Sequence, residues 1–226
     1  MRRLIVIMLI MQFFVSSAYA APCYGTRMPK AKELFGGTQS HVIFKRYLEE
    51  GWGEIRSTQY FLMFSYGIFD WLSLDLKGGA GNIKQRPPAS DEIDYSSSFA
   101  GGYGLRLKFY DSKKSSMVFG FQHISVHPQK THLGRVKHAA ILDDWQFSLL
   151  ASREVMGLTA YAGAKWSRLD YIHKVEEDRK RRMSDLTKDT GLVVGCDIPL
   201  GEKFWFNLEG QLIDTEALSL SLNYSF

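Results

Sequence analysis

Apolar and polar side chains alternate along the last nine residues of the chain. Leucine or an aromatic residue occupies every second position from Leu218 to Phe226. The positions between them hold Ser219, Ser221, Asn223 and Ser225. Because successive side chains of a β-strand point to opposite faces, this segment predicts a strand with one apolar and one polar face. The apolar face needs a protein partner or an apolar medium to cover it.

The same period of two recurs through most of the chain, with turn residues between the alternating segments. The clear segments are 59–66, 72–77, 103–109, 145–149, 204–209 and 218–226, and weaker ones are 41–48, 117–126, 158–169 and 192–198. The pattern therefore predicts an all-β chain of about ten strands, with eight and twelve as the bounds.

The connections between these segments alternate in length. Those at 67–70, 111–116, 154–157 and 199–203 are short, whereas 82–94, 128–140 and 173–188 are the three longest. Transmembrane barrels have short periplasmic turns and longer extracellular loops. We therefore expect a single transmembrane antiparallel up-and-down β-barrel with both termini on the periplasmic side.

A secreted β-sandwich or a lipocalin-like barrel would also show alternating strands. Two features favour the membrane barrel over these folds. The chain ends on a phenylalanine of the apolar face, and aromatic residues gather near strand ends, as they do in the girdles at membrane interfaces. These aromatic residues are Tyr60, Tyr66, Trp71, Trp145, Trp166 and Phe204.

The N-terminus predicts a secretory signal peptide. Arg2 and Arg3 precede a mostly apolar run at 4–15, and Ala18 and Ala20 have the spacing of a cleavage site. We therefore divide the chain into a signal peptide at 1–21, a periplasmic N-terminal segment at 22–36 and a barrel at 37–226. Export through this signal and the barrel pattern together predict an outer-membrane location.

Composition narrows the class of protein only slightly. The chain is 45% hydrophobic and 23% charged, which argues against disorder, and its mean hydropathy of −0.17 is compatible with strands that have one polar face. The formal net charge of +4 is too small to indicate nucleic-acid binding. We expect a monomer that binds no nucleic acid, no metal and no cofactor.

The C-terminal strand resembles that of the outer-membrane β-barrel families of Gram-negative bacteria, and the segment 66–74, with its Asp70-Trp71 turn, resembles their turn-then-strand unit. The resemblance implies that Tyr224 and Phe226 form the insertion signal recognised by the barrel-assembly machinery. It also implies contact with outer-membrane lipids and lipopolysaccharide.

Eight charged residues have the parity of the barrel interior. They are Lys45, Asp75, Lys77, Arg106, Lys108, Lys165, Asp197 and Glu209. The interior of a ten-strand barrel is only slightly wider than one that side chains fill, so an interlocking ionic network is expected. The corresponding function is a structural role or a narrow passive channel with porin-like permeability.

An alternative function is suggested by His123, which lies two residues before Ser125 and therefore shares its lipid-facing side. With Asp143 from the next strand, the pair resembles the catalytic residues of the lipid A 3-O-deacylases. The resemblance implies that Ser125 attacks an ester, His123 acts as the base and Asp143 orients it. Val126 stands where that family has asparagine, and the simpler interpretation is that His123 and Ser125 are polar groups at the point where the strand leaves the membrane.

Two further features leave alternatives open. Cys23 and Cys196 are the only cysteines, and they either form a disulfide that ties the N-terminal segment to the barrel or stay as two thiols. The basic run 179–182 follows the acidic run 176–178 and has no aromatic residues for stacking on bases. It is expected to be a solvated extracellular loop, or one that contacts lipopolysaccharide phosphates.

Overall fold

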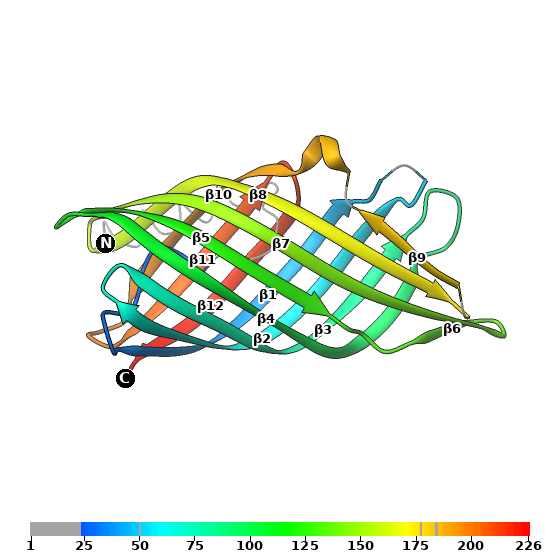
Figure 1. Ribbon diagram of the computed structural model, residues 1–226, viewed down its shortest axis with the longest axis horizontal. Helices are drawn as coiled ribbons and strands as arrows, with labels where there is room; N and C mark the ends of the chain where they lie inside the picture. The colour runs from blue at the N-terminus through cyan, green and yellow to red at the C-terminus, as the bar shows by residue number, and fades with distance from the viewer. Residues whose placement is uncertain (1–23, 50, 177, 184) are drawn as a thin grey trace, which may run out of the picture.

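The computed structural model describes residues 24–49, 51–176, 178–183 and 185–226, and ten of its strands form one closed antiparallel barrel (Figure 1). The barrel strands are β1 (Leu34–Tyr47), β2 (Glu54–Phe69), β3 (Leu72–Arg86), β4 (Ile93–Asp111), β5 (Ser115–Val126), β7 (Val136–Val155), β8 (Leu158–Val175), β10 (Thr190–Pro199), β11 (Phe204–Leu212) and β12 (Glu216–Ser225). Each pairs with its neighbour in sequence order, and β12 pairs with β1 to close the barrel. The predicted all-β barrel of about ten strands is confirmed.

Short turns lie at the barrel end where β1 begins and β12 ends. Residues 70–71, 112–114, 156–157 and 200–203 form these turns, as the alternation predicted. By the rule for outer-membrane barrels this is the periplasmic end, and the opposite end is extracellular. In the part of the chain that the structure describes, no helix is long and apolar enough to cross a membrane.

The predicted long loops at the extracellular end are largely strands. β7 and β8 pair from Val155 and Leu158 up to His138 and Val175, and two short strands continue this hairpin into a four-stranded sheet. These strands are β6 (Thr131–Leu133) on β7 and β9 (Asp178–Met183) on β8, followed by the short 3₁₀ helix η1 (Leu186–Lys188). Figure 1 shows this extracellular sheet projecting at the end opposite the C-terminus.

The register of the strands gives the tilt of the barrel. A row of directly paired residues that starts at Thr159 in β8 returns to β8 at Tyr171, twelve residues further along the strand. The row consists of Thr159, Asp197, Asn207, Ser221, Gln39, Phe61, Gly79, Ala100, Val126, Leu142 and Tyr171. With the usual spacings along and between strands, a shear of this size tilts ten strands by about 40° from the barrel axis.

The outer surface of the barrel carries an apolar belt. In β12, Leu220 and Leu222 are exposed, whereas the alternate residues Ser219 and Ser221 are buried. The aromatic residues predicted for the girdles are all exposed on this surface: Tyr60, Tyr66, Trp71, Trp145, Trp166 and Phe204. An exposed belt of this kind is covered by lipid in outer-membrane β-barrels, and this protein is one of them.

The interior changes character along the barrel axis. Toward the extracellular end it is an apolar core, which consists of Ile43, Leu48, Ile55, Phe61, Met63, Ile83, Ile93, Tyr95, Ala100, Ile124, Val126, Ala140, Leu142, Leu169, Tyr171 and Ala217. Toward the periplasmic end, buried charged and amide side chains replace these residues. Buried charges such as Arg46 and Asp214 also lie beside the apolar core, so both apolar packing and polar groups fill the extracellular half.

The segment before β1 enters the barrel from the periplasmic end. Thr26 and Met28 are buried, and the hydroxyl oxygen of Tyr24 is buried as well. The segment predicted as periplasmic at 22–36 therefore lies partly inside the lumen, and β1 begins at Leu34, three residues before the predicted barrel start. The predicted signal peptide at 1–21 and Cys23 lie outside the described residues.

Candidate functional site

The periplasmic half of the lumen is organised around Arg106 of β4. Its guanidinium donates from Nε and Nη2 to the two carboxylate oxygens of Asp75, at 2.9 and 2.7 Å. It also donates to the backbone carbonyls of Tyr24 and Arg27, at 2.9 and 2.7 Å. Because Asp75 neutralises the charge while the two carbonyls and Ser65 Oγ accept the other protons, Arg106 holds the N-terminal segment inside the barrel.

Cation–π contacts hold the same segment. Lys77 Nζ lies 3.9 Å from the centre of the Tyr24 ring, and the Arg27 guanidinium lies 4.1 Å from the centre of the Trp205 ring. Such contacts are strongest where water is excluded, as it is around the buried Lys77. The N-terminal segment is thus bound by side chains from opposite parts of the barrel wall.

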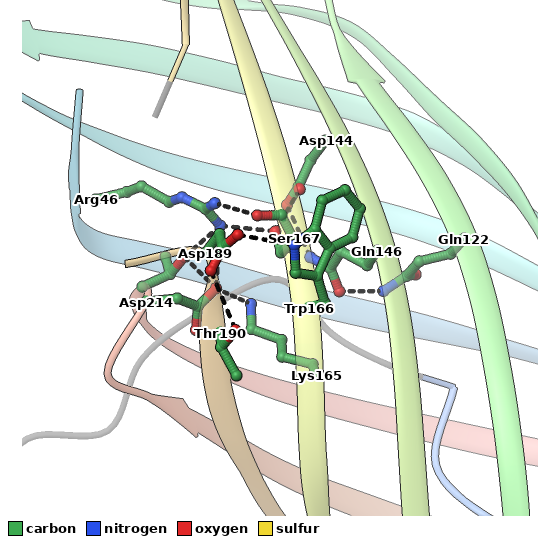
Figure 2. Close-up of polar contacts among 11 residues, drawn as sticks. Arg46, Gln122, Asp144, Gln146, Lys165, Trp166, Ser167, Asp189, Thr190 and Asp214 are labelled. Carbon is green, nitrogen blue, oxygen red and sulfur yellow. Dashed lines mark hydrogen bonds and ion pairs between the residues drawn. The ribbon is translucent and has the colours of Figure 1, made fainter. Parts of the chain in front are cut away.

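A second group of charges surrounds Arg46 of β1, which is 1% exposed (Figure 2). Arg46 Nη1 lies 2.8 Å from Ser167 Oγ and 3.2 Å from Asp214 Oδ2. Lys165 Nζ lies 2.8 Å from the same oxygen of Asp214. Two cations therefore share one buried carboxylate, and Thr215 Oγ1 accepts a further bond from Arg46 at 2.5 Å.

Figure 2 also shows how this group continues across the lumen. Ser167 Oγ donates to Asp144 at 2.7 Å, and Gln146 Nε2 donates to the other oxygen of Asp144 at 2.7 Å. Gln122 Nε2 then donates to Gln146 at 2.8 Å, and Lys77 Nζ donates to Gln122 at 3.4 Å. This chain of bonds, from β8 through β7 and β5 to β3, joins the two groups of charges.

A third polar group lies on the wall formed by β8, β10 and β11. Tyr161 OH donates to Glu209 at 2.9 Å and accepts from Asn207 Nδ2 at 3.0 Å, while Asn207 also donates to Asp197 at 2.8 Å. Both carboxylates are at most 3% exposed. Hydrogen bonds of this kind compensate the cost of keeping carboxyl groups away from bulk water.

Six of the eight charged residues expected in the lumen are buried there: Asp75, Lys77, Arg106, Lys165, Asp197 and Glu209. Lys108 is only partly buried, at the periplasmic opening, where its Nζ lies 2.7 Å from Asp111. Lys45 lies outside the barrel, 3.3 Å from Glu54 and over the exposed ring of Tyr47. The expectation for Lys45 was therefore wrong.

The reason is a β-bulge in β1 after Ile43. An inserted residue reverses the alternation beyond it, so Lys45 points outward and Arg46 points inward. A strict period of two places Arg46 on the outer face, so its inward position was not predicted. Asp214 was not predicted either, because it lies in the connection between β11 and β12, next to Ile213 with its positive φ of 83°. The mixture of polar and aromatic residues at 44–47 is the only sequence signal of the break in pattern.

The cavities found among the described lumen residues are small. Three cavities lined by described lumen residues have volumes of about 30, 10 and 10 Å³. Cavities of this size hold isolated water molecules. Side chains and the N-terminal segment thus surround these cavities and fill the rest of the lumen at the same levels.

The outer wall holds the other predicted site. His123, Ser125 and Asp143 lie on the lipid-facing side near the extracellular interface, and the ring centres of His123 and Trp145 are 4.2 Å apart. Ser125 Oγ donates to Asp143 Oδ1, and His123 Nε2 lies 3.8 Å from the same oxygen. Asp143 therefore lies between the serine and His123, which differs from the order of a serine–histidine–acid triad.

A fourth residue, His127, joins this outer-wall cluster. Its Nε2 lies 2.8 Å from Ser125 Oγ, and the hydroxyl would have to turn from Asp143 toward His127 before this histidine could accept its proton. The predicted base was His123, and the sequence offers His127 on the same parity two residues after Ser125. Cys196, from the predicted cysteine pair, is partly buried in β10, and its predicted partner Cys23 is outside the described residues.

Comparison with known proteins identifies no family. No family model and no curated protein matches the chain. Among solved structures, the transport unit of the autotransporter AIDA-I from Escherichia coli has a TM-score of 0.47 and 13% identity, with 91% of this chain and 93% of that chain covered. The COG4313 outer membrane channel from Pseudomonas putida F1 has a TM-score of 0.47 and 10% identity, with 92% and 100% covered.

The outer membrane protease OmpT from Escherichia coli has a TM-score of 0.44 and 10% identity, with 89% of this chain and 99% of that chain covered. At these identities the likeness concerns the fold alone. A transport unit, a channel and a protease occur together among these matches.

Proposed function

We propose that this outer-membrane barrel has a structural role and stays closed to ions and solutes under ordinary conditions. The observation that supports it best is the filling of the lumen at two successive levels. At the periplasmic level, the N-terminal segment is bound to Arg106 by two carbonyl bonds and packs against Lys77. A solute entering from this side would first have to displace the segment.

At the extracellular level, the apolar core lies across the same path. Ile55, Ile83 and Leu169 are fully buried in it, and Tyr171 OH donates to Gln85 at 2.7 Å. Ions cross such a region only with a large loss of hydration energy. Both levels would have to rearrange before the barrel could act as the narrow channel that its class also permits.

Planar-bilayer recording tests this proposal. Refolded protein should give no conductance steps at neutral pH, and the shift between heated and unheated gel migration should show that the inserted protein is folded. Regular steps would contradict the proposal. Lys77→Glu would then locate the path, because reversal of a lumen charge should change ion selectivity, whereas Lys113→Glu at a periplasmic turn serves as the control.

The outer-wall cluster favours a second candidate function, hydrolysis of an ester in an outer-leaflet lipid. With its hydroxyl turned from Asp143 to His127, Ser125 Oγ would attack the acyl carbonyl while His127 takes its proton, and His127 would pass that proton to the leaving alcohol. Water would then release the acyl group from Ser125. The 2.8 Å contact between Ser125 Oγ and His127 Nε2 supports this hydrolase hypothesis. It lies on the lipid-facing side, on the extracellular side of Trp145.

Mass spectrometry of lipid A from cells that express the protein tests the second candidate. Wild-type protein should remove one ester-linked acyl chain, Ser125→Ala should not, and Ser116→Ala should behave as wild type. Ser116 suits the control because it bonds to Ser152 at the periplasmic end, far from the cluster. An acyl pattern that is the same with and without the wild-type protein would refute the hydrolase.

A further inference from the structure

The outward face of the extracellular sheet is basic. Residues that pair across β7, β8 and β9 point to the same side, so their direction follows from that of the exposed Trp166 in β8. The basic residues of this face are Lys137, Arg168, Lys174, Arg179 and Arg181. Among the described residues of the same face, the acidic ones are Asp143 and Asp170, with Glu176 at the turn between β8 and β9.

Two of these arginines converge on one carboxylate. Arg181 Nη2 donates to Asp170 Oδ2, and Arg168 Nε lies 3.5 Å from Asp170 Oδ1. The Asp170 side chain is 2% exposed, but those of Arg168 and Arg181 are 44% and 57% exposed. Asp170 therefore holds Arg181 by a hydrogen bond and Arg168 by a longer ion pair, and the three side chains together carry a net charge of +1.

The position of this arginine pair relative to the membrane is defined by Trp166. Arg168 follows Trp166 by two residues, about 7 Å along the strand, which is about 5 Å along the axis of a barrel tilted by 40°. Trp166 belongs to the aromatic girdle at the edge of the apolar belt, so the pair lies at the depth of lipid headgroups. Phe147 and Leu149 continue the belt below it on β7.

We propose that Arg168 and Arg181 bind a phosphate group of a phosphorylated glycolipid of the outer leaflet, that is, of lipopolysaccharide. Planar guanidiniums bind phosphate oxygens in pairs, and a carboxylate that holds them in place lowers the entropy lost on binding. A ligand with both phosphate and acyl chains also matches the apolar surface next to the pair. This site is separate from the lumen, so it does not depend on whether the barrel conducts.

Native mass spectrometry of the full-length folded protein in detergent tests the site with defined probes. These are bis-phosphorylated lipid A, the same lipid A after removal of its phosphates, and inorganic phosphate. The main variant is R168Q/D170N/R181Q, which removes the arginines together with their carboxylate so that no buried charge is left alone. Lys113→Gln is the matched control, because it also lowers the net charge by one but lies at a periplasmic turn.

Wild-type protein and Lys113→Gln should retain bis-phosphorylated lipid A, and the triple variant should bind it about tenfold more weakly, the loss expected for one charge-assisted contact. Lipid A without phosphates should bind weakly to all three. Equal binding of the two lipids by the wild type, or unchanged binding by the triple variant, would overturn the proposal. Inorganic phosphate that binds as tightly as lipid A would overturn the assignment to a lipid.

The variant R168K/R181K keeps the charges and the carboxylate, so it tests the site even where the triple variant does not fold. Lysine cannot form the paired contacts of a guanidinium. We expect lipid A binding between that of the wild type and that of the triple variant, with gel migration of the folded form unchanged. Binding equal to the wild type would show that the guanidiniums do not make the contact.

Discussion

Single residues in this barrel differ in importance according to the side of the wall on which they lie. Arg46 and Lys45 are neighbours in β1, yet the first is in contact with Ser167 and Asp214 inside and the second with Glu54 outside. Removal of the Arg46 side chain leaves Asp214 paired with Lys165 but takes the buried hydrogen bonds from Ser167 and Thr215, whereas a surface pair contributes little. The two positions therefore form a natural comparison.

Arg46→Met should lower the free energy of unfolding by about 2–4 kcal/mol through these lost hydrogen bonds, and Lys45→Met by less than about 1 kcal/mol. Urea unfolding of the protein in lipid vesicles, followed by tryptophan fluorescence, measures both values. Equal effects of the two substitutions would contradict the inward position of Arg46.

A pH effect is expected from His173, seven residues beyond Trp166 on the extracellular part of β8. Burial, next to His138 and Lys180, lowers the pKa of His173 to about 4. The unfolded chain has a histidine pKa near 6.5 and takes up the proton first, so stability should fall as the pH is lowered from about 6.5 to 4. Hydrogen exchange of the β8 amides at pH 7.5 and 4.5 measures this.

The variant His173→Phe provides the control for that experiment. It keeps an aromatic ring against Trp52 and His138 but carries no titrating group. The difference in exchange between the two pH values should become smaller in this variant. If the difference stays the same, other groups cause it.

At the scale of elements, strands and turns follow from the sequence much better than the contents of the lumen do. Alternation identifies strands such as β12, and glycine- or charge-rich positions identify short turns such as 156–157. The bulge after Ile43 could not be located from the sequence, because the mixed polar and aromatic residues at 44–47 do not show where the extra residue is inserted. The path of residues 24–28 is not visible either, since an irregular segment has no period from which its surroundings can be read.

Observations at the candidate sites show the same limit of prediction from the sequence: it gives the face of a residue but not its contacts. Ser125 and Asp143 were predicted to share the outer face because parity alone places them there, and they are in contact. His127 as the nearest base, and the position of Asp143 between Ser125 and His123, depend on side-chain rotamers that parity does not define. Arg181 was predicted to lie in a solvated loop, but pairing of β9 with β8 brings it to Asp170.

The N-terminal segment gives a prediction at this scale. Tyr24→Ala removes the ring contacts with Lys77 and Arg106 and should lower the free energy of unfolding by about 2 kcal/mol. Lys30→Ala, an exposed position in the same segment, should change it by less than about 0.5 kcal/mol. Urea unfolding compares them, and an equally small effect at Tyr24 would indicate that the segment contributes no stability.

For the whole molecule, the shear of twelve residues fixes the shape of the barrel. Ten strands with this shear are tilted by about 40°, within the range of outer-membrane barrels. Polarised infrared spectroscopy of the protein in oriented membranes measures the tilt directly from the dichroism of the amide bands. A tilt below about 30° would contradict the register of the strands.

The position of the N-terminal segment also constrains how the molecule is assembled. The wall around residues 24–28 includes β11, and this wall is completed only when β12, the last strand of the described chain, pairs with β1. The beginning of the described chain is thus enclosed by its end. Barrel closure and docking of the segment must be coordinated in time, so a variant that weakens the bonds between Arg106 and the segment should slow the appearance of the fully closed form during refolding.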